Sequence, residues 1–334
     1  MIRVAINGFG RIGRGFTRAV HGKKNIEIVA INDLAPAGNL AYVLKYDTVY
    51  GRAPFSVEAA EGAIIMDGKK VPVLAEKDPA KLPWKDLSVD IVIESTGLFT
   101  TAEKAGAHIT AGAKRVVISA PGKGEGVVTI LMGVNEEKLK DCVISSNASC
   151  TTNAVGPVMG ILDEAIGIER AILNTTHAYT ASQAIVDGVA SDDFRRGRAA
   201  ALNMGPSSTG AAKATALVYP QFKGKFDGIA VRVPVASGSI ADVTFVAKRA
   251  TTVEEVNEAL RAASTTNRWK RVFAVTEEQL VSSDILGLPY GSIADLGSTR
   301  VVDGTLVKVL AWYDNEMGYV HTLVEHVLEA GKYV

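Results

Sequence analysis

The first half of the chain alternates short apolar runs with segments that have a helical pattern. Such segments, for example residues 101–111, place their apolar positions on one helical face. Five apolar runs, each short and rich in Val and Ile, lie at residues 3–7, 26–32, 90–94, 115–119 and 142–146. Runs of this kind are typical of parallel strands buried on both faces. The alternation therefore predicts an α/β fold with a doubly wound parallel sheet.

After about residue 150 the pattern changes. Strand-like segments become longer and alternate apolar with polar positions, at residues 171–176, 228–234, 240–248 and 306–313. This favours an α+β region with a large, mostly antiparallel sheet covered on one face. Helices are predicted at residues 252–264, where Thr252 and Glu255 form a capping box, and at residues 320–328.

Length and composition agree with two domains. A chain of 334 residues is long for a single hydrophobic core. Lys plus Arg and Asp plus Glu both number 36, so no net charge favours nucleic acid or a membrane surface. The only cysteines are Cys142, expected inside an apolar strand, and Cys150. With no signal segment or long apolar run in view, we expect a reduced, cytoplasmic protein.

A glycine motif follows the first predicted strand. Gly8, Gly10 and Gly13 form a GxGxxG sequence before a helical run at residues 14–21. Such glycines let the backbone approach a pyrophosphate, and a helix N-terminus supplies amide donors. Asp33 follows the second strand, where its carboxylate can bind both adenosine ribose hydroxyls and would repel a 2′-phosphate. A Rossmann-type site for NAD is predicted.

Cys150 is the candidate nucleophile. It follows a strand and precedes a helical pattern that reaches about residue 166, so the helix N-terminus should lower the pKa of its thiol. Pro157 lies beyond the first turn and should kink or shift that helix. His177 ends a predicted strand within a polar segment and is the candidate base, although spacing alone leaves this pairing open.

A candidate anion site lies further along the chain. Residues 206–213 (PSSTGAAK) resemble a turn that feeds a helix, with hydroxyls and amides suited to an anion. Arg232 interrupts an apolar strand and needs an anionic partner if it is buried. The basic cluster of Arg195, Arg196 and Arg198 fits a phosphate site, a solvated face or a subunit interface.

Several segments together resemble one family from end to end. INGFGRIGR (6–14), SNASCTTN (146–153), TTHAYT (175–180), STGAAKA (208–214) and WYDNEMGY (312–319) are similar to phosphorylating glyceraldehyde-3-phosphate dehydrogenase. The resemblance implies a homotetramer without a metal. It also implies an NAD-binding domain at 1–149, completed by a C-terminal helix at 315–334, and a catalytic domain at 150–314.

The resemblance further implies the role of each matching residue. Cys150 would be the nucleophile and His177 its base. Cofactor contacts would come from Gly8, Gly10, Arg11, Ile12, Asp33, Lys77, Thr96, Ser119 and Asn315. Phosphate contacts would come from Ser149, Thr151, Thr209 and Gly210 at one site, and from Thr180, Arg196 and Arg232 at the other. Residues 188–190 (GVA) depart from strictly NAD-using relatives, which leaves some NADP use open.

These roles imply oxidation of D-glyceraldehyde 3-phosphate with NAD and inorganic phosphate, through a thioester on Cys150. Two alternatives stay open. One is an erythrose-4-phosphate dehydrogenase-like enzyme that releases a free acid. The other is a nucleotide-binding protein without turnover.

Overall fold

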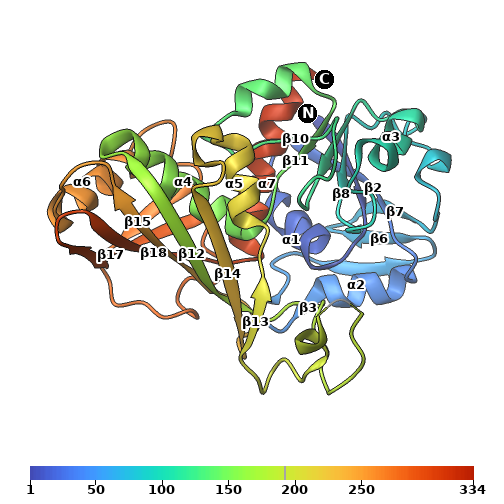
Figure 1. The fold of residues 1–334 in the computed structure, drawn as a ribbon. Helices are drawn as coiled ribbons and strands as arrows, with labels where there is room; N and C mark the ends of the chain where they lie inside the picture. Colours follow the sequence, from blue (N-terminus) through green and yellow to red (C-terminus); the bar gives the residue numbers. More distant parts are fainter. Residues whose placement is uncertain (192) are drawn as a thin grey trace. The chain divides into compact units, whose positions relative to one another are not determined.

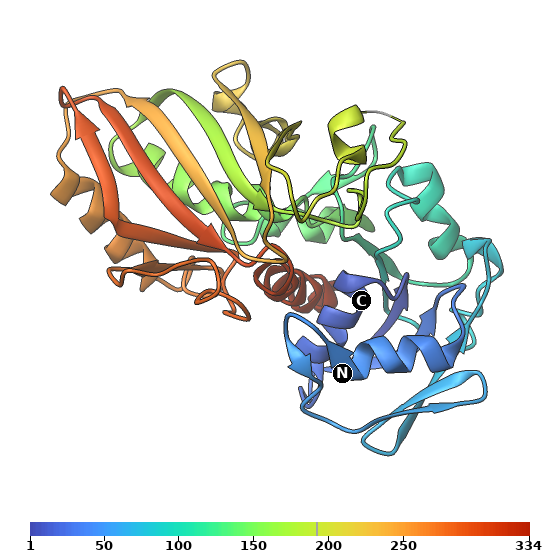
Figure 2. The same ribbon diagram turned by 90° about the horizontal axis from the view of Figure 1, so that it is seen from below.

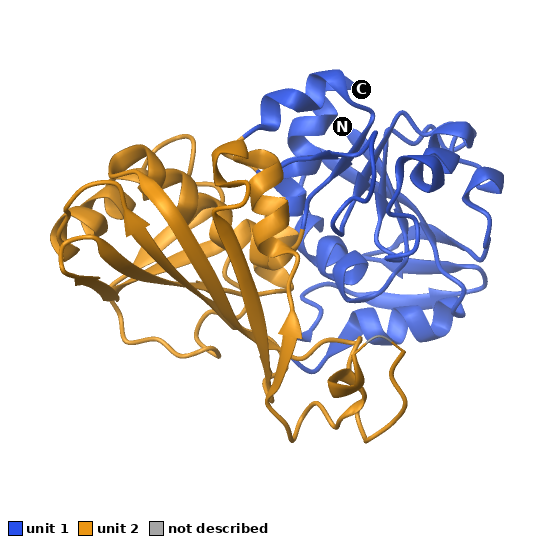
Figure 3. Cartoon of the chain, in the orientation of Figure 1, with its two compact units in different colours: residues 1–131, 135–148, 323–334 blue, residues 132–134, 149–322 orange. Residues whose placement is uncertain are grey.

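The computed structural model describes residues 1–191 and 193–334, which divide into two compact units (Figure 3). Unit 1 comprises residues 1–131, 135–148 and 323–334, and unit 2 comprises residues 132–134 and 149–322. The chain passes from the first unit to the second between Ala148 and Ser149. Helix α7 (Met317–Ala330) contributes residues to both units.

Unit 1 is built on a nine-stranded sheet with the strand order β10-β11-β9-β8-β1-β2-β7-β6-β5. Pairs from β10 to β7 are parallel, and β7-β6 and β6-β5 are antiparallel. The strands are β1 (Ile2–Asn7), β2 (Ile26–Asn32), β5 (Val57–Ala60), β6 (Ala63–Met66), β7 (Lys69–Leu74), β8 (Ile91–Glu94), β9 (Arg115–Ile118), β10 (Val128–Thr129) and β11 (Ile144–Ser146). A separate two-stranded sheet joins β3 (Tyr46–Asp47) to β4 (Gly51–Arg52).

Helices α1 (Arg11–Val20), α2 (Ala37–Lys45) and α3 (Ala102–Thr110) belong to this unit (Figure 1). Short 3₁₀ turns occur at Pro79–Lys81, Glu136–Asp141 and Gly331–Tyr333. The central strands β1, β8 and β9 are almost wholly buried, because this sheet needs apolar side chains on both faces. The predicted α/β sheet is therefore confirmed, and the antiparallel hairpin strands β5 to β7 extend it.

Unit 2 contains a seven-stranded, mostly antiparallel sheet with the order β13-β14-β12-β15-β18-β17-β16. Its long strands run side by side in Figure 2. They are β12 (Ile168–Ala178), β13 (Gly205–Ser208), β14 (Phe226–Val233), β15 (Ser239–Ala247), β16 (Phe273–Thr276), β17 (Ser292–Val302) and β18 (Leu306–Tyr313). Among the described strands of this sheet, only the pairs β12-β14 and β16-β17 are parallel.

Helices α4 (Cys150–Ala165), α5 (Ala211–Val218) and α6 (Val253–Ser264) pack on this sheet, and 3₁₀ turns occur at Phe194–Gly197 and Pro220–Phe222. Burial alternates strictly along β15, as expected for a sheet with one covered face. Thr252 caps α6 as predicted, with its side chain accepting from the Glu255 amide at 3.2 Å. The carboxylate of Glu255 instead accepts from Thr251 and Arg249.

Helix α4 continues through Pro157, where a kink or shift is predicted, and residues 151–162 of this helix are all buried. Two local expectations change in the structure. Helix α1 begins at Arg11, three residues before the predicted start. Cys142 lies outside β11, which begins two residues later. The carbonyl of Cys142 instead accepts a hydrogen bond from the buried Arg115 side chain, which keeps this residue out of the strand.

Candidate active site

The turn between β1 and α1 leaves no space for a side chain at Gly8 or Gly13. Gly8 has a φ of +92°, and a Cβ there would lie 2.7 Å from the Thr96 amide nitrogen. A Cβ on Gly13 would lie 2.5 Å from the Gly8 carbonyl oxygen. Gly10 is the N-cap of α1, so the first turn of this helix, at Arg11 and Ile12, follows the glycine directly. This is the arrangement that binds a pyrophosphate.

Asp33 lies directly after β2 and supports the same turn. Its Oδ2 accepts from the backbone amide of Phe9 at 2.7 Å, and its Oδ1 accepts from the Ala35 amide at 3.0 Å. Each carboxylate oxygen still has capacity for a further donor. Asp33 therefore fixes the glycine turn while remaining available to a ribose.

A hollow in unit 1 gathers most of the predicted cofactor residues. Its lining includes Gly8, Gly10, Asp33, Lys77 and Thr96. Asn7 and Asn32, which end β1 and β2, also line it. Ser119 follows β9 and is not part of this lining; its amide donates to the Glu94 carbonyl at 2.9 Å.

Beneath this hollow lies a buried carboxylate that sequence patterns did not reveal. Glu94 Oε2 accepts from Asn7 Nδ2 at 2.6 Å and lies 3.1 Å from His108 Nε2. Glu94 Oε1 accepts from the Thr96 amide at 2.8 Å. Trp84 Nε1 donates to His108 Nδ1 at 3.0 Å, so the neutral ring carries its proton on Nε2 and donates it to Glu94. Glu94 thus accepts hydrogen bonds from Asn7 and Thr96, two residues that line the hollow.

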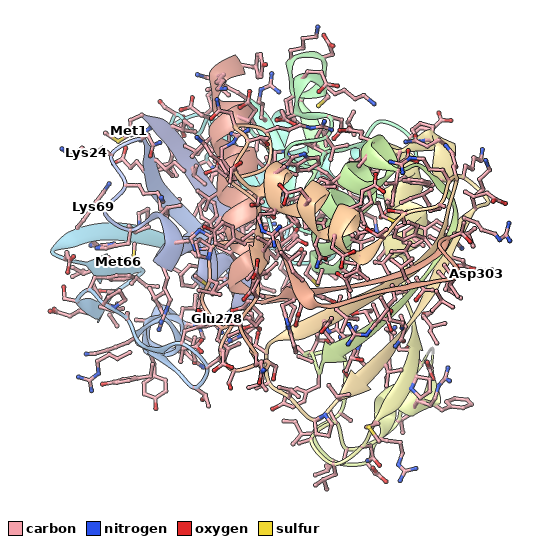
Figure 4. The ribbon with its side chains drawn as sticks, turned by 90° about the vertical axis from the view of Figure 1, so that its left-hand side faces the viewer. Met1, Lys24, Met66, Lys69, Glu278 and Asp303 are labelled. Atoms are coloured by element: carbon pink, nitrogen blue, oxygen red, sulfur yellow. The ribbon has the colours of Figure 1, made fainter. Side chains whose placement is uncertain are left out.

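A second hollow of unit 1 has different chemistry. Met1, Lys24, Met66 and Lys69 line it and lie near one another in Figure 4. In it, Lys69 bonds Glu27, and His21 Nε2 lies 2.8 Å from Asp67. Its glycine, Gly22, follows helix α1 and does not precede a helix, and we therefore do not assign the dinucleotide to it.

Cys150 occupies the first position of α4. Ala148, two residues earlier, has a φ of +55°, so the backbone turns sharply after β11. The Ser149 side chain caps the helix by accepting from the Thr152 amide at 3.1 Å. The predicted position of the thiol at a helix N-terminus is therefore present.

The sulfur of Cys150 lies 3.4 Å from His177 Nε2. His177 is the penultimate residue of β12 and pairs in register with Arg232 on the parallel strand β14. Strand pairing brings His177 next to Arg232, and helix α4 supplies Cys150 from a distant part of the sequence. For this reason sequence spacing could not decide the contact.

The pKa of Cys150 differs from the expectation. Burial raises the pKa of the thiol, although Thr151 and Arg232 oppose the shift. Burial and the nearby Arg232 lower the pKa of His177 to about 4. The backbone amides of Thr151 and Cys150 at the helix N-terminus lower the pKa of the thiol, as predicted. The predicted net lowering is wrong, because the desolvation of a thiolate exceeds the effect of these amides. Both directions favour a neutral thiol beside a neutral imidazole near pH 7.

Tyr313 lies behind this pair and is fully buried. Its hydroxyl lies 3.0 Å from Thr151 Oγ1 and 2.7 Å from Thr175 Oγ1. Its ring meets the His177 imidazole edge-on at a centroid distance of 5.9 Å. Thr175 Oγ1 also donates to the Ile240 carbonyl at 3.2 Å. Three hydroxyls thus form a chain beside Cys150 and His177, and no sequence pattern pointed to Tyr313.

Two protein-family models match the chain. The model of the glyceraldehyde 3-phosphate dehydrogenase NAD-binding domain matches residues 2–102, and that of the C-terminal domain matches residues 149–315. The chain belongs to the glyceraldehyde-3-phosphate dehydrogenase family. The resemblance seen in the sequence is therefore confirmed, and the cofactor of the family model is NAD.

Bacterial members of the family align over almost the whole chain. The Thermotoga maritima glyceraldehyde-3-phosphate dehydrogenase is 52% identical over 328 residues, covering 97% of this chain and 98% of the relative. The Streptomyces coelicolor enzyme is 50% identical over 333 residues, covering 99% of this chain and 98% of the relative. The Geobacillus stearothermophilus enzyme is 48% identical over 326 residues, covering 97% of this chain and 96% of the relative. A search of the described helices for a membrane-spanning segment found none of sufficient length and apolarity.

The four arginines considered for a phosphate site differ in their partners. Arg195 and Arg198 form exposed ion pairs with Asp193 and Asp187, each at 2.9 Å. Arg196 donates to Ser207 Oγ at 3.3 Å. Arg232 makes no ion pair with a described residue, and burial together with repulsion from Arg196 lowers its pKa. Arg232 and Arg196 thus place two positive charges close together, which suits a phosphate group.

The remaining predicted phosphate residues are polar and partly exposed. Thr180 Oγ1 lies 2.9 Å from Ser182 Oγ. Thr209 Oγ1 accepts from the Ala211 amide at 3.2 Å, and Gly210 is the N-cap of α5. Thr209 and Gly210 thus stand at a helix N-terminus whose amides suit an anion.

Asn315 is oriented by three donors within unit 2. Its Oδ1 accepts from the Gly238 amide at 3.1 Å and from the hydroxyls of Ser239 and Ser237 at 2.9 and 3.4 Å. Since all three groups donate to one oxygen, the amide nitrogen faces away from them and remains a donor. This orientation suits a carboxamide oxygen such as that of nicotinamide.

Proposed function

We propose that this protein oxidises D-glyceraldehyde 3-phosphate with NAD and inorganic phosphate to 1,3-bisphosphoglycerate, as in glycolysis. One observation carries the proposal: the Cys150 thiol lies 3.4 Å from the His177 imidazole, and the neighbouring Arg232 has no ion-pair partner among the described residues. The thiol provides the nucleophile, the imidazole the base, and the arginine a site for the phosphate of the substrate.

The proposed reaction starts from the neutral pair. His177 Nε2 takes the thiol proton as Cys150 Sγ forms a bond to the aldehyde carbon, and the carbonyl oxygen becomes an oxyanion. The backbone amide of Cys150 and the protonated His177 stabilise that oxyanion. NAD supplies the acceptor for the hydride that leaves the same carbon. A thioester remains on Cys150.

Inorganic phosphate then completes the cycle. One of its oxygens attacks the thioester carbon, the C–S bond breaks, and an acyl phosphate leaves while Cys150 takes back a proton. We assign Thr209, Gly210, Ser149 and Thr151 to the attacking ion, and Thr180, Arg196 and Arg232 to the substrate phosphate. Gly8, Gly10, Arg11, Ile12, Asp33, Lys77, Thr96 and Ser119 would bind the dinucleotide, and Asn315 its nicotinamide.

The decisive experiment follows NADH formation with and without inorganic phosphate. Strict phosphate dependence, together with loss of turnover in Cys150→Ser, is the expected result. Phosphate-independent release of a free acid would replace the proposal by an erythrose-4-phosphate dehydrogenase-like activity. NAD binding without any turnover would leave only a nucleotide-binding protein.

We further propose that the protein assembles as a homotetramer in the cytoplasm. The sheet of unit 2 presents exposed Ile172 and Ile229, and residues 185–204 expose further large apolar side chains, including Val189 and Phe194. Apolar surface of this extent favours contact with another copy. Light scattering of the wild type and of Ile172→Asp tests this, with a smaller assembly expected for the variant. A reducing compartment would keep Cys150 free.

A further inference from the structure

Three neighbouring strands of unit 1 end at the cofactor hollow in polar residues. Asn7, the last residue of β1, pairs in register with Asn32 at the end of β2 and with Glu94 at the end of β8. All three side chains are buried. Asn7 Nδ2 donates to Glu94 Oε2 at 2.6 Å, and Asn7 Oδ1 accepts from Asn32 Nδ2 at 2.7 Å. The strand ends are therefore joined by one buried chain of hydrogen bonds.

The backbone of Glu76 fixes the direction of this chain at one end. Asn32 Nδ2 also donates to the Glu76 carbonyl, and Asn32 Oδ1 accepts from the Glu76 amide, both at 2.9 Å. A backbone carbonyl can only accept and a backbone amide can only donate, so the side-chain amide of Asn32 has a single orientation. Asn32 Nδ2 then faces Asn7 Oδ1, which leaves Asn7 Nδ2 to donate to Glu94.

Trp84 fixes the direction at the other end. Its indole N–H, which can only donate, lies 3.0 Å from His108 Nδ1. A proton on Nδ1 would place two donors face to face, so Nδ1 is bare and the proton of the ring is on Nε2. His108 Nε2 lies 3.1 Å from Glu94 Oε2 and 3.4 Å from Asn7 Nδ2. It donates to the carboxylate, and the longer distance separates two donors that converge on the same oxygen.

Both ends of the chain thus require the same arrangement, in which Glu94 only accepts. Glu94 Oε1 accepts from the Thr96 amide at 2.8 Å and also from the Thr96 hydroxyl. Each hydrogen-bond partner of the carboxylate is a donor, as a buried, ionised carboxylate requires. No described Lys or Arg forms an ion pair with it, so its charge depends on these donors.

Two segments that line the hollow depend on the same chain. Thr96 donates to Glu94, and Asn32 binds the backbone of Glu76, which directly precedes Lys77. Trp84 and His108 are fully buried and do not line the hollow. Their side chains therefore influence the hollow through the carboxylate.

From this geometry we propose that Trp84 and His108 are positioning residues for the dinucleotide. Trp84 keeps Nδ1 of His108 bare, and the proton on Nε2 completes the set of donors around Glu94. The carboxylate in turn orients the side chains that fix both segments of the hollow. The inference rests on the proposed function, in which the dinucleotide occupies this hollow.

The first measurement reads the proton on His108 and requires no turnover. Wild-type protein labelled with ring-15N histidine is studied by magic-angle-spinning NMR at pH 7, and the His108 signals are assigned by their loss in His108→Gln. A protonated Nε2 and a bare Nδ1 are expected. A ring protonated on Nδ1, alone or together with Nε2, would overturn the inference.

The second measurement is the affinity for ADP-ribose by calorimetry. This probe has the adenosine and pyrophosphate of NAD but lacks the nicotinamide. His108→Leu removes the donor to Glu94 and should weaken binding roughly tenfold, the effect of one hydrogen bond. His108→Gln retains an N–H donor and should restore most of the affinity. His21→Leu, which removes another carboxylate-bonded histidine of unit 1, should bind as the wild type does.

Trp84→Phe provides an independent test, because it removes the indole donor and keeps an aromatic ring. It should also weaken ADP-ribose binding, and initial rates should show a higher KM for NAD with kcat unchanged. A merely structural role would lower thermal stability without this split between KM and kcat. Wild-type affinity in folded His108→Leu and Trp84→Phe, or equal losses in His108→Gln and His108→Leu, would overturn the inference. The ADP-ribose result is independent of whether turnover requires phosphate.

Discussion

The carboxylate of Asp33 accepts a hydrogen bond from the backbone amide of Phe9 at 2.7 Å. The residue expected to recognise the adenosine ribose therefore also fixes the turn that approaches the pyrophosphate. Cofactor selectivity and turn geometry depend on the same side chain.

We expect Asp33→Asn to weaken NAD use more than NADP use. The amide group would direct a donor at either Phe9 or Ala35, each of which is itself a donor, and would no longer repel a 2′-phosphate. Losing a charge-assisted hydrogen bond costs roughly 1.5–3 kcal/mol, or about ten- to a hundredfold in affinity. Steady-state kinetics with both cofactors measure the change. Asp78→Asn, outside the hollow, is the control, and an unchanged NADP-to-NAD ratio would contradict the prediction.

Glu94→Gln should weaken NAD binding without altering any group that contacts the cofactor. The carboxylate accepts from Asn7, Thr96 and His108. The side-chain amide of a glutamine would direct its own N–H groups at one of these donors, and the hydrogen bond to that donor would be lost. The residues that line the hollow would then be held less firmly in position. We expect roughly a tenfold loss in affinity by calorimetry, equivalent to one hydrogen bond of about 1.4 kcal/mol. Glu103→Gln, in the first turn of α3, should bind NAD as the wild type does.

Tyr313→Phe should lower stability and affect inorganic phosphate more than the aldehyde. It leaves the hydroxyls of Thr151 and Thr175 without their buried partner, which costs about 1–3 kcal/mol of unfolding free energy. Because Thr151 then loses its fixed orientation, the KM for phosphate should rise more than the KM for the aldehyde. Chemical denaturation and initial rates provide the two measurements. Tyr333→Phe, at the partly exposed C-terminus, is the matched control; equal changes in both KM values would contradict a role for Tyr313 in orienting Thr151.

Stability should fall as the pH drops below about 6.5. Burial lowers the pKa of His326 to about 3, and burial with Arg232 lowers that of His177 to about 4. The unfolded chain binds protons near pH 6.5 whereas the folded chain does not, so stability is complete above that pH and is lost toward pH 3–4. Thermal unfolding between pH 7 and pH 4.5 measures this loss. His326→Gln should flatten the dependence, and a slope equal to that of the wild type would exclude His326 as a contributor.

Sequence patterns predicted the local parts of the fold well. The glycine turn, Asp33 after β2 and Cys150 before α4 all depend on neighbours a few residues away, and strand and cap signals are local. The contact between His177 and Arg232 depends on the register of β12 with β14. Neither strand specifies its partner. The pairing therefore became visible only in three dimensions.

Burial accounts for the largest error at the site. A helix N-terminus alone favours a thiolate, but the protein around Cys150 raises its pKa. Tyr313 and Glu94 were missed for a related reason. Each lies in an apolar strand pattern, and most of the groups that form hydrogen bonds with its side chain come from segments distant in the sequence.

Helix α7 is shared between the two units. Its C-terminal half supplies His326, which contacts Ser145 and Asn147, and the following residues place Tyr333 against Arg115. Residues 323–334 at the C-terminus thus belong to unit 1, whose first strand, β1, lies at the N-terminus. A recombination event that exchanged only the first 148 residues would therefore leave out residues 323–334, which belong to the same compact unit.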